Sequence, residues 1–233
     1  MNVKHQACRR DEPTASGRLS IDRSGKLPRP CDTAVAAFDF DGTITTSNSL
    51  RDFVRFTAGG PRLIYGALRA APWFLGFLIG KCDRASAKAH FLAGALGGLT
   101  RPQLEAAAQR YATERLPELI RPEMHARIQE HKRLGHRLVL VSASLTLYLR
   151  IFANSSGFDA VLATELEYQG DYLSGRLGSR DCWGPEKVKR LQQWLGGDRP
   201  RVLFAYGNST GDREMLALAD HAWLRGMGAM PVL

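Results

Sequence analysis

The chain has 233 residues, 44% of them hydrophobic and 9% aromatic, which is enough to bury a substantial core and excludes a wholly disordered protein. Its formal net charge of +9 indicates an anionic partner, such as nucleic acid, a membrane surface or a phosphorylated metabolite. No stretch interleaves Lys or Arg with aromatic residues as a nucleic-acid platform would, so the sequence argues against a nucleic-acid partner.

Residues 1–33 are rich in Arg, Ser, Gly, Pro and Asp and have no apolar period, so we expect a disordered extension without an assigned function. Its polar start lacks the apolar segment of a signal peptide, which favours a cytoplasmic protein. The cysteines lack CxxC spacing, which indicates free thiols and neither a zinc site nor a disulfide framework. They are Cys8, Cys31, Cys82 and Cys182.

A short and mostly apolar run at residues 34–40 contains Asp39 near its end, and Asp41 follows it directly. These two carboxylates are separated by one residue. The run predicts a buried parallel strand, and the two-residue period of a strand points both acids the same way. Like charges so close repel unless a cation lies between them, which suggests a metal site, an acid–base pair or both. An ordinary exit from a strand into a turn is the alternative, because Asp and Gly are common in turns.

Residues 50–122 have helical spacing throughout and interrupt the α/β pattern as an all-helical block. Within it, segment 63–80 is unusually apolar. A membrane-spanning helix is disfavoured because the segment barely reaches the required length and contains Arg69 and Pro72. We expect Pro72 to separate two short helices of a buried or partly exposed hairpin. A peripheral contact of 63–80 with a membrane remains the alternative.

Strands and helices alternate beyond residue 122. The sequence predicts helices at 123–134, 147–152, after Gly184 and from Arg213. It predicts strands at 137–144, 160–167, 201–206 and 221–224, the last of them an edge strand, and a hairpin turn at 169–175. Such alternation predicts an α/β fold with a parallel sheet covered on both faces. We therefore expect a core made of residues 34–49 and 123–233, with residues 50–122 as a helical cap.

Ligands in such sheets bind outside the carboxyl ends of the strands, and every predicted strand end or junction there carries a polar group. Ser142 ends the second strand, Lys187 lies in the first turn of a later helix, and the strand at 201–206 leads into Asn208 and Asp212. Each group alone has an ordinary structural explanation. Their convergence at one edge makes a shared site the better interpretation.

In this order and spacing the motifs resemble the haloacid dehalogenase superfamily, specifically subfamily IB, its phosphoserine-phosphatase-like branch. The resemblance covers residues 34–224 and rests on Asp-x-Asp-Gly-Thr at 39–43, Ser142, Lys187 and the motif at 207–212. It implies a Rossmann-like parallel sheet with an inserted all-helical cap. It also implies a phosphomonoester hydrolase that requires Mg²⁺ and forms an aspartyl-phosphate.

The resemblance assigns roles to individual residues. Asp39 would be the nucleophile, and Asp41 the general acid and then the general base. The phosphate would be held by Ser142, Lys187, Thr43 and Gly42, and Mg²⁺ by Asp39, the Asp41 backbone carbonyl, Asp212 and Asn208. Asn208 departs from the family pattern, because an acid is usual there, and this substitution removes one negative charge from the metal site.

The cap selects the substrate, and two features of this cap bear on it. Phosphoserine phosphatases place a Glu shortly after the first motif, whereas residues 45–49 contain no acid. The aromatic and apolar segment 63–80 resembles caps that handle lipid or bulky phosphates. We therefore expect a small phosphorylated metabolite or a lipid phosphate as substrate. The alternatives are a phosphoserine phosphatase proper, a catalytically weak phosphate-binding regulatory module, which Asn208 favours, and a membrane-associated protein.

Overall fold

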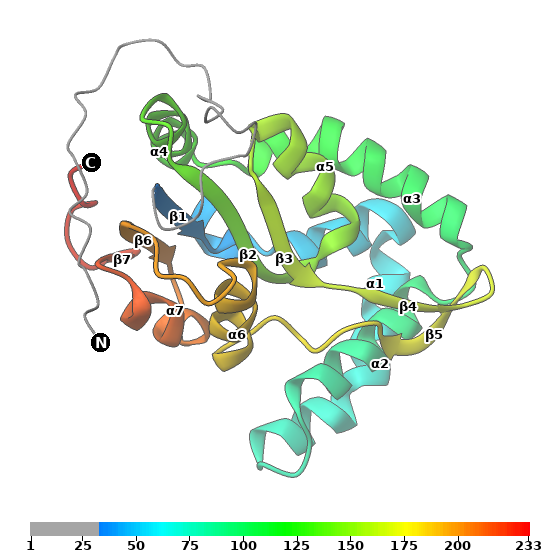
Figure 1. The fold of residues 1–233 in the computed structure, drawn as a ribbon. Helices are drawn as coiled ribbons and strands as arrows, with labels where there is room; N and C mark the ends of the chain where they lie inside the picture. The colour runs from blue at the N-terminus through cyan, green and yellow to red at the C-terminus, as the bar shows by residue number, and fades with distance from the viewer. Residues whose placement is uncertain (1–32) are drawn as a thin grey trace, which may run out of the picture.

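A computed structural model describes residues 33–233, so the predicted disordered extension lies outside the described residues apart from its last position. The centre is a five-stranded parallel sheet in the order β3-β2-β1-β6-β7 (Figure 1). Its strands are β1 Ala34–Phe38, β2 Arg137–Leu145, β3 Ala160–Thr164, β6 Val202–Gly207 and β7 His221–Leu224. The predicted α/β class with a parallel sheet and a final edge strand is confirmed.

Helices cover both faces of the sheet because alternate residues of each strand point to opposite sides. Phe38 of β1 packs in a core with α4 (Pro122–Arg133) and α5 (Thr146–Ser156). Val35 and Ala37 face a second core with α6 (Pro185–Trp194) and α7 (Arg213–Leu218). The central strand is therefore buried on both faces, which explains why its sequence is an unbroken apolar run.

Between β1 and α4 the chain is helical, as the sequence predicts. It forms α1 (Ser49–Leu78), α2 (Arg84–Leu96) and α3 (Arg101–Arg110), followed by a wide turn at Tyr111–Arg115 and a 3₁₀ turn at Leu116–Leu119. The first two helices pack side by side as a hairpin that projects from the body of the molecule (Figure 1). We keep the term cap for residues 50–122.

The expectation that Pro72 separates two short helices is wrong. The helix α1 continues through Pro72 and is instead broken at Gly59, where the backbone turns to φ 80° and ψ 172°. Gly tolerates this conformation, and Pro61 then lies at the start of the next helical segment, where its missing N–H has no partner to lose. The turn of the hairpin follows at residues 79–83.

The predicted strand at 160–167 is two strands, because β3 ends at Thr164 and β4 begins at Leu166. The antiparallel pair β4 (Leu166–Gln169) and β5 (Tyr172–Leu177) forms the predicted hairpin, and β5 lies against α2 of the cap. This small sheet therefore links the α/β core to the cap.

Candidate active site

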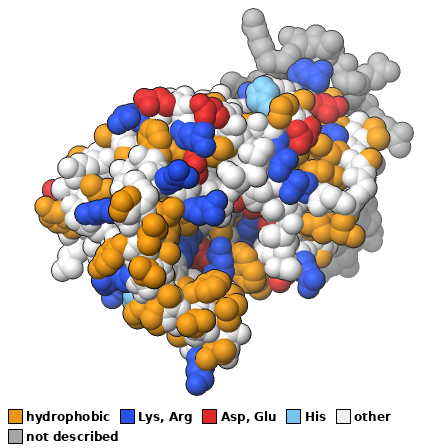
Figure 2. Space-filling view, turned by 180° about the vertical axis from the view of Figure 1, so that it is seen from behind, with side chains coloured by type: hydrophobic (Ala, Val, Ile, Leu, Met, Phe, Trp, Pro, Cys, Tyr) orange, Lys and Arg blue, Asp and Glu red, His pale blue; other side chains and the backbone are white. Residues whose placement is uncertain are grey.

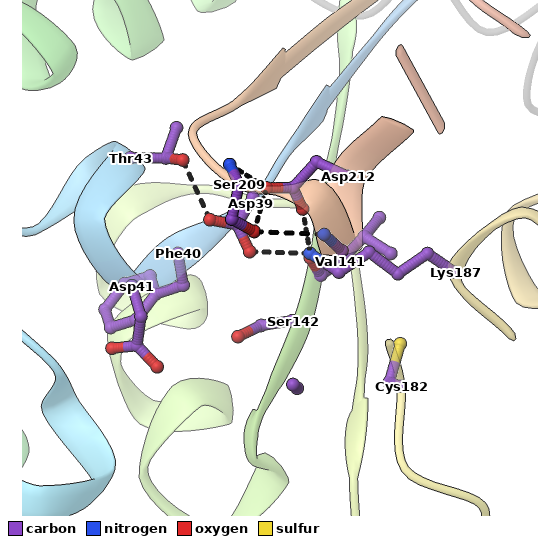
Figure 3. A network of polar contacts seen from close by, with 12 residues as sticks. Asp39, Phe40, Asp41, Thr43, Val141, Ser142, Cys182, Lys187, Ser209 and Asp212 are labelled. Carbon is purple, nitrogen blue, oxygen red and sulfur yellow. Dashed lines mark hydrogen bonds and ion pairs between the residues drawn. The ribbon is translucent and has the colours of Figure 1, made fainter. Parts of the chain in front are cut away.

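A buried lysine lies at the centre of the charged groups at the carboxyl edge of the sheet (Figure 3). Lys187 Nζ donates to Asp39 Oδ1 at 2.6 Å, to Asp212 Oδ1 at 2.6 Å and to the carbonyl oxygen of Val141 at 2.9 Å. All three ammonium protons are thus satisfied, as a buried cation requires. The side chains of Asp39, Lys187 and Asp212 are at most 8% exposed.

These three groups come from separate elements. Asp39 is the residue after β1, Lys187 is in the first turn of α6, and Asp212 precedes α7. The second oxygen of Asp212 accepts from Asn208 N at 3.1 Å and from Ser209 N at 2.9 Å. The backbone between β6 and α7 therefore fixes this carboxylate independently of the lysine.

The loop Phe40–Ile44 holds the other oxygen of Asp39. Thr43 Oγ1 donates to Asp39 Oδ2 at 2.8 Å. The turn requires a φ of 79° at position 42, which glycine adopts readily. A Cβ at this position would also lie 2.2 Å from the Asn208 side-chain amide. Gly42 thus serves the site as a backbone position that no other residue can fill without displacing Asn208.

The charges interact strongly enough to alter proton binding. Burial raises the pKa of Asp39 to about 6, outweighing the opposing ion pair with Lys187. For Asp212, burial is outweighed by Lys187 and the backbone N–H donors, so its pKa lies below the usual value. Burial also opposes the charge on Lys187, but the two carboxylates prevail and raise its pKa. The lysine is therefore firmly charged at neutral pH.

Oxygen atoms around Asn208 form a further cluster. One terminal atom of its amide lies 3.2 Å from Asp39 Oδ2 and 3.1 Å from the carbonyl oxygen of Asp41. A nitrogen there donates to both oxygens, whereas an amide oxygen there faces two other oxygens, an arrangement that a cation stabilises. Adjacent ligands of an octahedral Mg²⁺, each at about 2.1 Å from the ion, are about 3.0 Å apart. The spacing and the oxygen chemistry of these donors therefore fit Mg²⁺.

The Asp41 carboxylate belongs to a different network, and Figure 3 shows it apart from the lysine and its partners. Ser49 N, at the start of α1, donates to Asp41 Oδ1 at 2.6 Å, and the Ser144 hydroxyl donates to Asp41 Oδ2. Behind them Ser49 Oγ lies 2.9 Å from the Tyr148 hydroxyl. The two aspartates separated by one residue are thus held by separate partners.

A cap residue also reaches the core beside the site. Lys88 of α2 is 8% exposed, and its Nζ donates to Asp181 Oδ1 at 2.8 Å and to the carbonyl oxygen of Ala143, next to Ser142. Arg84 of the same helix also pairs with Asp181. Burial lowers the pKa of Lys88, although Asp181 opposes the shift. These ion pairs fasten the cap to the core.

The structure places every predicted site residue at this one edge of the sheet. Ser142 is 1% exposed, and its hydroxyl accepts from Ser144 N at 3.0 Å. Within residues 33–233 no group of three His, Cys, Asp or Glu side chains could hold a metal ion by itself. The candidate donors described above include a backbone carbonyl and an amide. The cysteines in this range, Cys82 and Cys182, are free.

Three residues beside the site were not predicted from the sequence, namely Ser144, Lys88 and Asp181. Ser144 has a signal in the sequence, because it lies two residues after Ser142 in the same strand and so shares its face. Lys88 is a basic residue within an Ala-rich helix, which is a weak signal. Asp181 has no signal in the sequence, because its partners Arg84 and Lys88 lie 97 and 93 positions away.

Comparisons with known proteins agree with this geometry. A family model described as haloacid dehalogenase-like hydrolase matches residues 36–217. Protein CicA of Caulobacter vibrioides is 36% identical over 192 residues, which cover 82% of this chain and 85% of that protein.

Solved structures share the fold. A protein of unknown function from Bordetella pertussis Tohama I superposes with a TM-score of 0.69 at 21% identity, covering 82% of this chain and 89% of the other. A substrate-bound phosphoserine phosphatase gives a TM-score of 0.56 at 16% identity, covering 82% and 84%. A phosphoserine phosphohydrolase-like protein from Francisella tularensis gives 0.58 at 18% identity, covering 81% and 85%.

Proposed function

The chain belongs to the haloacid dehalogenase-like hydrolases, and we propose that it is a phosphatase that hydrolyses phosphomonoesters through an aspartyl-phosphate and requires Mg²⁺. The family assignment made from the motifs is confirmed. The observation that carries the proposal is the buried Asp39, which is held by Lys187 at 2.6 Å and by Thr43 at 2.8 Å at the edge where ligands bind in such sheets.

Asp39 supplies the nucleophile. Its carboxylate attacks phosphorus, the bond to the ester oxygen breaks, and the phosphoryl group is transferred to Asp39. Asp41 gives its proton to the departing alkoxide, which leaves as an alcohol. Asp41 then takes a proton from water as that water attacks the aspartyl-phosphate, which releases inorganic phosphate and restores both carboxyl groups. The separate networks of the two aspartates support this division of roles.

Lys187 balances charge during transfer. Its three protons are already donated to Asp39, Val141 and Asp212, so a contact with a phosphoryl oxygen replaces one of these hydrogen bonds. Ser142 is the second candidate for phosphate binding, because its hydroxyl lies at the end of the sheet next to the lysine's carbonyl partner. Fixed donors of this kind stabilise charge on the transferring group.

Mg²⁺ would be held by Asp39, the carbonyl oxygen of Asp41 and Asn208, with Asp212 nearby through its hydrogen bond to Asn208 N. Its positive charge would offset the repulsion between these carboxylates and an anionic phosphate. Lys187 alone faces two carboxylates, so an incoming phosphate needs a further cation. An amide oxygen at position 208 keeps a ligand while it removes one negative charge.

The substrate class we propose is a small phosphorylated metabolite or a lipid phosphate. Residues 45–49, which follow the first motif, carry no acid to bind the amino group of phosphoserine. This argues against phosphoserine, although neighbours with the same fold are described as phosphoserine phosphatases. A panel of phosphorylated metabolites and lipid phosphates tests the point, and a preference for phosphoserine would refute it.

The reaction class is tested with a generic aryl phosphate. We expect hydrolysis by the wild-type protein that depends on added Mg²⁺ and is absent in Asp39→Asn. Trapping of radiolabelled phosphate on the protein after acid quenching tests the covalent intermediate, which Asp39→Asn should not form. Equal rates for the wild type and the variant would rule out the proposed chemistry.

A further inference from the structure

The second half of α1, from Pro61 to Leu78, presents small residues to its partner helix. Gly66, Ala70 and Gly76 are buried there. A Cβ on Gly66 would lie 2.7 Å from the Ala95 side chain, and one on Gly76 would lie 2.6 Å from Cys82 Sγ. The hairpin therefore packs closely through its small residues and through Trp73, which stacks on His90 of α2, while several of its other large apolar side chains point away from α2.

Those large side chains are exposed on the opposite side of α1 and on the turn that follows. The exposed fractions are 62% for Ile64, 56% for Tyr65, 68% for Leu68, 61% for Leu75, 62% for Leu78 and 66% for Ile79. At about 100° per residue, these positions fall on one side of the helix. We call these six residues the hairpin stripe. Figure 2 shows hydrophobic side chains covering the projecting lobe of the molecule.

Basic residues of the same segment flank the hairpin stripe. Segment 61–84 contains four basic residues and one acidic residue, which leaves a net charge of +3. Arg62, Arg69 and Lys81 are exposed, and the acidic residue, Asp83, uses its side chain to cap α2. An apolar stripe with this charge is complementary to a surface that combines negative charge with accessible hydrocarbon.

We propose that the hairpin stripe is a docking surface for a bilayer that contains anionic lipids, with α1 lying in the plane of the interface. No helix within residues 33–233 is long and apolar enough to cross a membrane, so the contact is peripheral. The large apolar side chains enter the boundary between headgroups and acyl chains, while Arg and Lys side chains contact lipid phosphates. The hairpin projects from the body of the molecule (Figure 1), which leaves the side of α1 that carries the stripe accessible to a planar surface.

A second copy of the chain is the competing occupant. Because segment 61–84 carries a net positive charge, a symmetric contact between two hairpin stripes would bring two segments of like charge together. Like charges brought together in this way oppose association, whereas anionic lipids neutralise them. The charge pattern therefore favours the bilayer.

Flotation of the full-length protein with vesicles tests the docking surface. We expect binding to phosphatidylcholine vesicles that contain phosphatidylglycerol, and weaker binding to phosphatidylcholine alone or at high salt. The double variant Leu68→Gln with Leu75→Gln should lose at least about 10-fold in partitioning. Leu134→Gln removes a leucine that is 52% exposed outside the hairpin, and this matched control should bind as the wild type does.

The outcomes separate docking from catalysis. The double variant should hydrolyse a soluble aryl phosphate at the wild-type rate, and Asp39→Asn should still float with vesicles. The docking proposal is overturned if the wild type stays unbound on every vesicle, or if Leu134→Gln weakens binding as much as the double variant. It is also overturned if light scattering shows a dimer that the double variant dissociates, without any vesicle binding.

Discussion

The sheet edge and the hairpin stripe differ in which side chains are buried and which are exposed. At the edge Lys187, Asp39 and Asp212 are buried, and each lies within hydrogen-bond distance of fixed partners. On the hairpin the six large apolar side chains of the stripe are exposed, and the helix packs on α2 mainly through glycine, alanine and Trp73. One region buries charge, which costs free energy unless the charges are paired, and the other exposes hydrocarbon, which costs free energy unless a partner covers it.

The two regions also differ in how much a single substitution can change their function. The chemistry of the edge depends on individual atoms held within a few tenths of an ångström, so a single substitution should abolish it. Binding of the stripe to a bilayer depends on the total exposed apolar area and charge. A single substitution there should therefore weaken binding only slightly, and several together should weaken it more. Substitutions in the two regions measure this contrast, and the largest effect is expected at the nucleophile.

Asp39→Asn should lower turnover of an aryl phosphate by about 10⁴-fold or more, because an amide cannot act as the nucleophile. The amide has the same shape, and Lys187 keeps its partner Asp212, so the fold should remain intact. Steady-state kinetics and circular dichroism measure the two effects. Retained turnover, or loss of the folded signal, would contradict this assignment.

Lys187→Met should lower the free energy of unfolding by about 3–5 kcal/mol, because it leaves two buried carboxylates without their cation. Lys81→Met is the matched control on the exposed hairpin and should change stability by less than about 0.5 kcal/mol. Urea denaturation of both variants measures the contrast. Similar losses in the two variants would show that the buried pairs do not carry the stability we assign to them.

Mg²⁺ should raise the Tm more at pH 7.5 than at pH 5. The pKa of Asp39 is raised from 3.8 to about 6 without metal, so below pH 6 a proton competes with the ion for this carboxylate. For the same reason the stability of the metal-free protein should fall as pH rises from about 4 to 6, because the unfolded chain loses this proton first.

Calorimetry at several pH values measures the shift. At pH 7.5 and about 100 times the Kd, Mg²⁺ should raise the Tm by about 5 °C. Asp39→Asn should remove most of this stabilisation at every pH. A Mg²⁺ shift that is independent of pH, or unchanged in Asp39→Asn, would show that the ion binds elsewhere.

Ser144→Ala should produce the smallest of these effects, a decrease in kcat of about 10-fold with little change in KM. The variant removes one of the hydrogen bonds that orient the Asp41 carboxylate, and the one from Ser49 N remains. Ser155→Ala, which removes an exposed hydroxyl from α5, is the control and should behave as the wild type. A change confined to KM would assign Ser144 to substrate binding instead.

The class of fold and the residues at the edge of the sheet could be predicted from the sequence alone. Strands that alternate with helices form a parallel sheet whose carboxyl ends meet, so Asp39, Ser142, Lys187 and Asp212 could be expected to lie together. The helical cap and the family followed from the same motifs. These features depend on local patterns and on their order along the chain, both of which the sequence displays directly.

The partners that hold these groups, and the side of the hairpin that is exposed, could not be predicted in this way. Lys187 pairs with Asp39 across 148 positions, and Lys88 with Asp181 across 93. The break at Gly59 in place of Pro72, and the outward stripe of segment 63–80, depend on how closely α1 packs against α2. Contacts between distant residues and the choice of a buried face arise from packing, which an apolar run alone does not specify.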